Sequence, residues 1–369
     1  MRLVYLSPIP WESFAQRPHK FIEWFHAKFQ GEVLWVDPYP TRLPNKEDFR
    51  RHKTALVSSK SLSKKPPYWL QVIRPTALPI EPLPASGVIN RFLWQGVVRK
   101  IEVFLNVRES YIGVGKPSEI ALQILKRHPE VPSFYDAMDD FPAFYKGLSR
   151  QAMAQREWAI AERASTILVS STALAARFEG YKSKVFKVLN ACDAERIPGE
   201  KLILRNSEHP VFGYVGTIGD WFDWSLVIAL ANTNPMARIR LIGPVYSSPP
   251  EGMPSNIELL AACNHAAALR AMQNFSVGLI PFKKTELTAS VDPIKYYEYR
   301  SLGLSVISTR FGEMSFREKQ QGVFLVTDQS DFSSIITQAL TYQSNKKEIE
   351  QFKNENSWRA RFDACHIFN

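Results

Sequence analysis

The sequence predicts an α/β protein of two domains, each a parallel sheet wrapped by helices, and three observations lead to this prediction. The 369 residues exceed what one hydrophobic core usually supports. Short apolar runs typical of strands alternate with longer amphipathic stretches typical of crossover helices. A polar stretch with Gly and Pro at residues 195–210 separates two such series. We therefore place domains at residues 1–195 and 196–353, followed by a helical segment at 354–369.

The first domain begins with a strand at Leu3–Leu6 and a helix that Pro18 can start, because its fixed φ suits a first helical turn. Residues 45–84 are rich in Lys, Ser and Pro without a clear period, which indicates irregular surface structure. The remaining predicted elements are strands at Val33–Val36, Tyr111–Val114, Ser133–Tyr135, Thr166–Ser170 and Val185–Leu189, and a helix at Ser149–Arg163.

The second domain contains four apolar runs that predict strands, at residues 211–216, 239–244, 275–282 and 304–309. Before the last of these, Pro293 can begin a helix and Gly303 can end it. The final segment, Ser357–Ile367, predicts a short helix.

The composition is that of a soluble protein, with 45% hydrophobic and 22% charged residues. No run of apolar residues is long enough to span a bilayer, and the first residues lack the basic leader and cleavage site of a secretory signal. Cys192, Cys263 and Cys365 are far apart and odd in number, which argues against a disulfide framework or a zinc site. We expect a cytoplasmic protein.

The net charge of +10 is concentrated in the first part of the chain. Residues 1–199 carry 29 Lys and Arg against 19 Asp and Glu, whereas the rest carries 17 of each. Such a basic half indicates a polyanion or the inner face of the cytoplasmic membrane as a partner, or only a solvated basic surface. Residues 89–108 combine aromatic, aliphatic and basic side chains, as in a helix at a membrane interface. A helix packed on its own sheet with basic residues outward gives the same pattern. We expect no nucleic-acid partner.

The most specific stretch is residues 291–309. On the helix predicted there, Lys295 and Glu298 are three residues apart and project from one face near the N-terminus. A lysine there can contact a diphosphate together with free backbone N–H groups, and the carboxylate can accept hydrogen bonds from two ribose hydroxyls. An ordinary surface Lys–Glu pair would have the same spacing.

This stretch, VDPIKYYEYRSLG, resembles the N-P-L-K-x-Y-E-Y-x-x-x-G segment of GT-B glycosyltransferases, in the group around family 4. Residues 11–21, WESFAQRPHKF, are similar to the W-x-x-x-x-QRP loop of that group, and residues 134–144, FYDAMDDFPAF, to its Y-D-x-M-D-D-Y segment. Further similar segments follow in the family's order at 187–193, 212–224, 239–244 and 277–282. The resemblance implies two Rossmann-like domains facing across a cleft. It implies an N-terminal acceptor domain, a C-terminal donor domain and a final helix that crosses back to the first domain.

Carried over residue by residue, the resemblance implies that Lys295 contacts the diphosphate and Glu298 the ribose. The loop under the donor would be formed by Gly216, Thr217 and Gly219, where absent side chains let the backbone approach phosphate. Retaining members usually place an acidic residue eight positions before the ribose-binding Glu, but this chain has Ser290 there. The departure weakens the case for a retaining mechanism and removes one contact to the donor sugar.

For acid–base chemistry we select Asp139 and Asp140, which together with Asp136 follow a predicted strand. Crowded carboxylates raise one another's pKa, so one of them could act as general base on an acceptor hydroxyl. Similarity in layout to the xanthan glucuronosyltransferases, an inverting GT-B group, places Asp139 on their proposed base. The alternative is a cluster that caps the next helix and shapes the turn.

Arg17 and His19 lie in the first strand-to-helix loop, where a guanidinium and a helix N-terminus could hold a phosphate of donor or acceptor. A structural arginine and a surface histidine fit the sequence equally well. Asp223 is either a ligand contact or a helix N-cap. Nothing in the sequence resembles a metal cage, so we expect a metal-independent reaction without a cofactor.

We therefore predict a hexosyltransferase-type enzyme. It would move a sugar from a nucleotide-sugar donor to a hydroxyl of a glycan or lipid-linked glycan, in surface polysaccharide synthesis. An epimerase of similar fold is disfavoured, because no GxGxxG follows a strand. The alternative from another class is a non-catalytic subunit that binds a sugar nucleotide or a polyanion.

Overall fold

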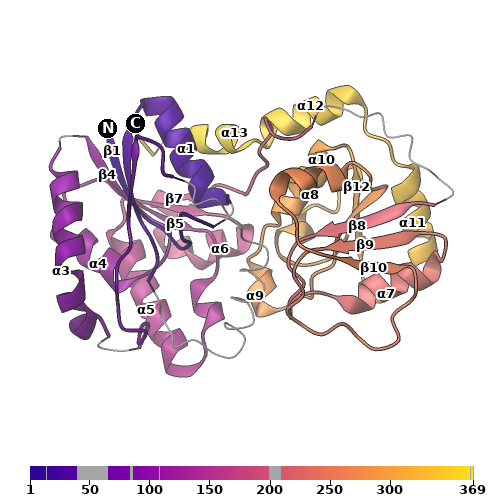
Figure 1. The fold of residues 1–369 in the computed structure, drawn as a ribbon, viewed down its shortest axis with the longest axis horizontal. Helices are drawn as coiled ribbons and strands as arrows, with labels where there is room; N and C mark the ends of the chain where they lie inside the picture. The colour runs from indigo at the N-terminus through magenta and orange to yellow at the C-terminus, as the bar shows by residue number, and fades with distance from the viewer. Residues whose placement is uncertain are drawn as a thin grey trace. The chain divides into compact units, whose positions relative to one another are not determined.

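The computed structural model describes residues 1–13, 15–39, 65–83, 86–107, 109–198, 209–365 and 367–368, which form two compact units (Figure 1). Among these residues, unit 1 contains those from Met1 to Leu189 and those from Phe362 onward, and unit 2 contains Asn190–Arg361. The first boundary predicted from the sequence, at residue 195, is a few residues later than in the structure. The second, at residue 353, is a few residues earlier. Most of the predicted linker, residues 199–208, lies outside the described residues.

Unit 1 contains a parallel sheet of seven strands in the order β3-β2-β1-β4-β5-β6-β7. The order reverses between β1 and β4, which creates a topological switch point at the carboxyl ends of these strands. The strands are β1 (Arg2–Leu6), β2 (Glu32–Val36), β3 (Leu70–Ile73), β4 (Ser110–Val114), β5 (Ser133–Ala137), β6 (Thr166–Val169) and β7 (Val185–Lys187). The prediction of irregular structure over residues 45–84 is wrong for Leu70–Ile73, which form β3. Residues 45–64 and 84 lie outside the described part of the chain.

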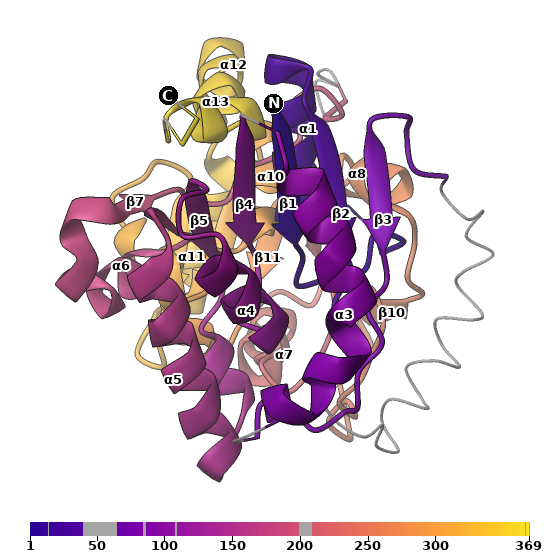
Figure 2. The same ribbon diagram turned by 90° about the vertical axis from the view of Figure 1, so that its left-hand side faces the viewer.

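Helices cover both faces of this sheet because side chains alternate along each strand. Val4 and Leu6 point into the core beneath α3, α4, α5 and α6, whereas Tyr5 points to the other face and stacks on Phe21 of α1. Figure 2 shows α3, α4 and α5 in front of the strands and α1 behind them. The helical elements are α1 (Arg17–Phe29), α3 (Ser86–Leu105), α4 (Glu119–Arg127), η1 (Phe141–Phe144), α5 (Gly147–Arg163), α6 (Thr172–Arg177) and η2 (Glu179–Lys184).

The C-terminal residues complete the core of unit 1 on the α1 face. The ring of Phe362, which is fully buried, lies 5.1 Å from that of Phe21, and the ring of Phe368 lies 5.0 Å from that of Phe25. Unit 1 is therefore built from two stretches of chain that are separated in sequence by the whole of unit 2.

Unit 2 contains a parallel sheet of six strands in the order β10-β9-β8-β11-β12-β13. Its strands are β8 (Val211–Val215), β9 (Arg238–Ile242), β10 (Ile257–Leu260), β11 (Val277–Ile280), β12 (Ser305–Thr309) and β13 (Val323–Val326). One core packs beneath α7 and α11, and the other beneath α8, α10 and α12. The helical elements are α7 (Trp224–Thr233), α8 (His265–Met272), α9 (Glu286–Ala289), α10 (Ile294–Ser301), η3 (Gly312–Phe316), α11 (Phe332–Thr341), α12 (Lys346–Glu355) and α13 (Trp358–Asp363), the last of which ends in unit 1.

Within the described residues, no helix combines the length and the apolar character that crossing a membrane requires.

Candidate active site

Helix α10 holds Lys295 and Glu298 together. It follows Pro293 and ends before Gly303, whose φ of +72° is a left-handed conformation that glycine adopts without strain. Glu298 is 4% exposed, and Lys295 Nζ donates to its Oε2 at 2.5 Å. His265, at the start of α8, contributes a second contact, since its Nε2 lies 2.9 Å from Oε1. A carboxylate only accepts, so this ring nitrogen carries the proton.

These two neighbours keep Glu298 ionised. Burial alone would raise the pKa of its carboxyl, but Lys295 and His265 outweigh burial and hold the pKa below its usual range. The result is a buried carboxylate that can accept hydrogen bonds from hydroxyls at neutral pH. Sequence reasoning missed His265, because a single histidine at a helix start has no distinguishing pattern.

The loop after β8 contains Gly216, Thr217 and Gly219, which the sequence assigns to donor binding. Gly216 donates its N–H to the carbonyl of Ile242 at 3.0 Å, and a Cβ at this position would lie 2.6 Å from Tyr214 Oη. The backbone N–H groups of Thr217 and Gly219 donate to no other residue in the described part of the chain. They are therefore available to phosphate oxygens.

The structure connects this loop to α10. Tyr299, on α10, is fully buried, and its hydroxyl accepts a hydrogen bond from the backbone N–H of Val215 at 3.2 Å. The residue that precedes Gly216 is thus fixed to the helix that carries Glu298. Ser290 is buried at the end of α9, two residues before Asp292.

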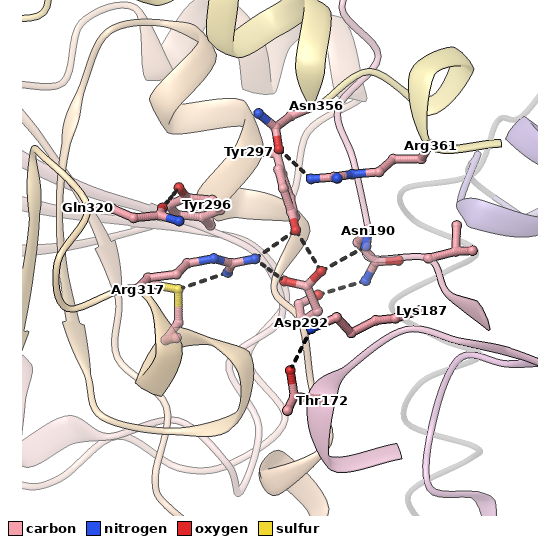
Figure 3. Close-up of polar contacts among 12 residues, drawn as sticks. Thr172, Lys187, Asn190, Asp292, Tyr296, Tyr297, Arg317, Gln320, Asn356 and Arg361 are labelled. Atoms are coloured by element: carbon pink, nitrogen blue, oxygen red, sulfur yellow. Dashed lines mark hydrogen bonds and ion pairs between the residues drawn. The ribbon is translucent and has the colours of Figure 1, made fainter. Parts of the chain in front are cut away.

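Asp292 anchors the chain just before α10 (Figure 3). Its Oδ1 accepts from Arg317 Nη2 at 2.7 Å, and its Oδ2 accepts from Tyr297 Oη and from the backbone N–H of Asn190, both at 2.8 Å. The Arg317 guanidinium also lies 3.8 Å from the centre of the Tyr296 ring. Asp292 is 3% exposed, so this network is a buried, fully paired support for the N-terminus of α10.

In unit 1, Arg17 and His19 have buried protein partners. Arg17 is 2% exposed; its Nη2 donates to Asp136 Oδ1 at 2.8 Å, and its Nη1 donates to the carbonyl of Val188 at 2.6 Å. His19 is 1% exposed, and its Nε2 lies 3.1 Å from the carbonyl of Trp11. The expected contact of these two side chains with a phosphate has no support in this geometry, because their polar atoms already bind the protein.

Asp140 and Asp139 differ in their surroundings. Asp140 forms an ion pair with Arg177, which also donates to the buried Glu157 at 2.5 Å. Glu157 in turn accepts from Tyr135 Oη at 2.7 Å. Asp140 is therefore part of a structural cluster at the end of β5, although its side chain does not cap η1.

Asp139 is half-buried, and its carboxylate has no hydrogen-bond or ion-pair partner within the described ranges. Burial raises the pKa of Asp139 to about 7; Arg17 opposes the shift, and Asp136 and Asp140 add to it. Among the carboxylates of this segment, Asp139 has the character expected of a general base near neutral pH.

Two further predictions concern the donor loop and metals. Asp223 caps α7, because its Oδ1 accepts from the N–H of Leu226 at 3.2 Å. The N-cap alternative is therefore confirmed. Across the described ranges, no group of three or more His, Cys, Asp or Glu side chains is arranged to hold a metal ion.

No protein-family model and no curated protein matches this sequence. Solved structures match along its whole length. The sucrose-phosphate synthase of Thermosynechococcus elongatus has a TM-score of 0.66 at 12% identity, covering 100% of this chain and 97% of that chain. HepE of Anabaena, solved with UDP-glucose, has a TM-score of 0.65 at 13% identity and coverages of 99% and 98%. The lipopolysaccharide outer core galactosyltransferase WaaB has a TM-score of 0.61 at 11% identity, covering 99% of each chain.

These similarities establish the fold. The chain has the GT-B fold with two Rossmann-like domains, and the predicted fold class is confirmed.

Proposed function

We propose that this protein is a glycosyltransferase that moves a sugar from a nucleotide-sugar donor to a hydroxyl of a glycan or lipid-linked glycan. The observation that carries the proposal is the ionised carboxylate of Glu298, held by Lys295 and His265 on a helix fixed to the 216–219 loop. A buried carboxylate beside free backbone N–H groups suits the ribose and diphosphate of a nucleotide. The UDP-glucose named for HepE supports a uridine nucleotide as the first donor to test.

Unit 2 supplies donor binding and unit 1 supplies the base. Asp139 takes the proton of the acceptor hydroxyl. At the same time the acceptor oxygen forms a bond to the anomeric carbon of the donor sugar, and the bond from that carbon to the diphosphate oxygen breaks. Lys295 and the N–H groups of Thr217 and Gly219 stabilise the charge that develops on the departing diphosphate. This single displacement inverts the anomeric centre and needs no metal. It is consistent with the neutral Ser290 at the position where retaining enzymes have an acidic residue.

Thermal unfolding with UDP, GDP, CMP and dTDP, each in the presence of a chelator, tests donor binding. A nucleotide at 100 times its dissociation constant stabilises the folded protein by about 2.7 kcal/mol. Mass spectrometry of acceptor mixtures incubated with the matching sugar nucleotide then tests transfer. If none of the four nucleotides raises the melting temperature, the proposal is wrong. If a nucleotide binds but neither sugar transfer nor donor hydrolysis is detected, a non-catalytic subunit is favoured.

We also propose that the protein acts at the inner face of the cytoplasmic membrane, as expected for surface polysaccharide synthesis. Helix α3 buries Trp94, Val98 and Ile101 against the sheet, yet its opposite side exposes apolar side chains. Phe92 is 74% exposed and Val103 is 69% exposed, and basic Arg99 and Lys100 lie among them. Apolar side chains flanked by basic ones suit a surface of anionic lipid.

A further inference from the structure

The Asp139 side chain depends on its backbone for its position. No described residue forms a hydrogen bond or an ion pair with its carboxylate, so the side chain is placed by the turn that carries it. This turn, residues 137–141, leaves the carboxyl end of β5 and leads into η1. A general base is effective only when it is held close to the proton that it accepts, so the contacts that fix this turn matter for catalysis.

Two local hydrogen bonds fix the shape of the turn. The N–H of Met138 donates to the carbonyl of Asp136 at 2.9 Å, and the N–H of Phe141 donates to the carbonyl of Asp139 at 3.1 Å. Both bonds join residues that are two apart in sequence. They set the curvature of the turn, but they do not attach it to the rest of the sheet.

Ser170 attaches the turn to the neighbouring strand. It directly follows β6, which pairs with β5 and places Val169 opposite Ala137. The Ser170 N–H donates to the carbonyl of Ala137 at 3.2 Å, and the Ser170 hydroxyl donates to the carbonyl of Met138 at 2.8 Å. The second bond continues the ladder past the end of regular strand pairing, with a hydroxyl in place of a backbone N–H.

The environment of Ser170 makes this bond dependable. Ser170 is fully buried, so water does not compete for its hydroxyl. The next residue, Ser171, is also fully buried, but its hydroxyl accepts from the N–H of Leu174 at 3.2 Å and caps α6. The two serines are neighbours with equal burial, and within the described part of the chain only the Ser170 hydroxyl bonds to the turn that carries Asp139.

We infer that Ser170 is a positioning residue for the proposed reaction: its hydroxyl holds the carbonyl of Met138 and thereby keeps the Asp139 carboxylate in place for the acceptor hydroxyl. The inference rests on the proposed function, in which Asp139 is the base. Without the Ser170 hydroxyl, the turn is released from β6 at Met138, although the backbone bond to Ala137 remains. Asp139 then keeps its ability to accept a proton but is less often in the reactive position.

Hydrogen exchange of backbone amides tests the attachment without any substrate. In Ser170→Ala, the amides of Met138 and Phe141 should exchange severalfold faster than in wild type, because the turn opens more often. Ser171→Ala is the matched control, and it should accelerate exchange at Leu174 but not in the turn. Wild-type protection of the turn in Ser170→Ala would overturn the inference.

Transfer rates test the consequence for catalysis. Initial rates are measured with UDP-glucose and the acceptor that mass spectrometry identifies. For Ser170→Ala we expect kcat to fall about tenfold, because a small displacement of a catalytic group costs much of its effect. The KM for the donor should stay unchanged, since the proposed donor contacts lie in unit 2. Ser171→Ala should retain the wild-type kcat.

The pH profile separates a displaced base from a loss of folded protein. Burial raises the pKa of Asp139 to about 7; Arg17 opposes the shift, and Asp136 and Asp140 add to it. A released turn admits more water to the carboxylate, so the apparent pKa of kcat/KM should be lower in Ser170→Ala than in wild type. A smaller amount of correctly folded enzyme would instead lower the rate at an unchanged apparent pKa.

Asp139→Asn, measured alongside, distinguishes this inference from the proposed function. If Asp139→Asn is slow but Ser170→Ala keeps the wild-type kcat and pH profile, the inference is wrong and the proposed base stands. If Ser170→Ala and Ser171→Ala lose the same fraction of activity, the loss is structural and the inference is again wrong. If wild-type protein transfers no sugar, or if Asp139→Asn turns over normally, the proposed reaction fails and the positioning role fails with it.

Discussion

Asp136, Asp139 and Asp140 lie within one short segment, but each has a different environment. Arg17 neutralises Asp136 in a fully buried pair, and Arg177 neutralises Asp140. Asp139 has no such partner within the described ranges, and its pKa is raised to about 7. The raised pKa lets Asp139 exchange a proton near neutral pH.

The first prediction is that Asp139→Asn lowers turnover by about 10²-fold or more, because the amide cannot accept the proton of the acceptor hydroxyl. Donor affinity, measured by calorimetry, should hardly change. Asp140→Asn is the matched control, and it should lower the melting temperature more than the rate, since it breaks the pair with Arg177. Normal turnover in the Asp139 variant would remove it from catalysis.

The pH dependence follows from the same group. A base works only when deprotonated, so kcat/KM should rise with pH and level off above an apparent pKa near 7. Stability should change in the opposite direction. The pKa of Asp139 is higher in the folded than in the unfolded protein. Its contribution to the free energy of unfolding is therefore complete below the unfolded pKa and is lost as pH rises through about 7. Asp139→Asn should therefore be less active yet more stable than wild type at pH 8, in thermal unfolding at matched pH values.

The second prediction concerns Glu298. Replacing it by Ala should weaken nucleotide binding by about 1 to 3 kcal/mol, because the ribose hydroxyls lose a charged acceptor in a buried site. Glu318→Ala is the control, at an exposed carboxylate paired with Arg310 on the surface of unit 2. Equal nucleotide affinity of both variants by calorimetry would contradict the assignment of Glu298.

The sequence could indicate residue types at these positions but not their partners. The spacing of Lys295 and Glu298 predicts one shared face, and the structure places the two side chains in contact. The position of Arg17 in a strand-to-helix loop predicts an anion-binding residue, but in the structure its guanidinium forms a buried ion pair with Asp136. Asp136 lies more than a hundred residues away, so no local pattern could reveal that the arginine is already occupied.

At the scale of elements, the strands predicted correctly are mostly central, and the missed ones are all at sheet edges. The runs around β1, β8 and β12 are almost entirely buried on both faces, because helices cover both sides of a parallel sheet. The missed strands β3, β10 and β13 end their sheets and are partly exposed, so their composition is mixed. Hydrophobic periodicity is weak in such strands, since it reflects burial more than hydrogen bonding.

The C-terminal segment offers a test at this scale. Phe362 is fully buried against Phe21 and Trp24 of α1, so Phe362→Ala should destabilise unit 1 by about 3 to 5 kcal/mol. The control is Phe316→Ala, because Phe316 is 63% exposed. Urea unfolding would measure the loss of stability, and hydrogen exchange of backbone amides would show which unit loses it. Exchange that accelerates only in unit 2 would show that the segment does not support unit 1.

At the scale of the molecule, the uneven charge and the exposed side of α3 belong to the same unit. The basic first half of the sequence contains α3, whose outward side chains include Phe92 and Val103. The sequence offered a membrane helix and a packed helix as alternatives for residues 89–108. In the structure α3 has a buried apolar side, and it also exposes apolar side chains on the opposite side.

The fourth prediction is that the protein binds vesicles containing anionic phosphatidylglycerol at low ionic strength, and that added salt weakens binding through screening. Phe92→Ser with Val103→Ser should reduce co-sedimentation severalfold, because both apolar contacts with the lipid are lost. Leu148→Ser with Met236→Ser is the control pair, at apolar side chains that are also exposed but lie outside α3. If wild-type protein ignores such vesicles, the membrane proposal is wrong.

The split composition of unit 1 has a consequence for how the protein is made. A ribosome releases the chain from the N-terminus, and domains generally fold as they emerge. Unit 2 is continuous in sequence, but the aromatic core of unit 1 needs Phe362 and Phe368, which follow the whole of unit 2. The domain synthesised first is therefore the one completed last. Until then, the aromatic side chains of α1 that Phe362 and Phe368 cover in the folded protein stay exposed to solvent, so the nascent chain is prone to aggregation for most of translation.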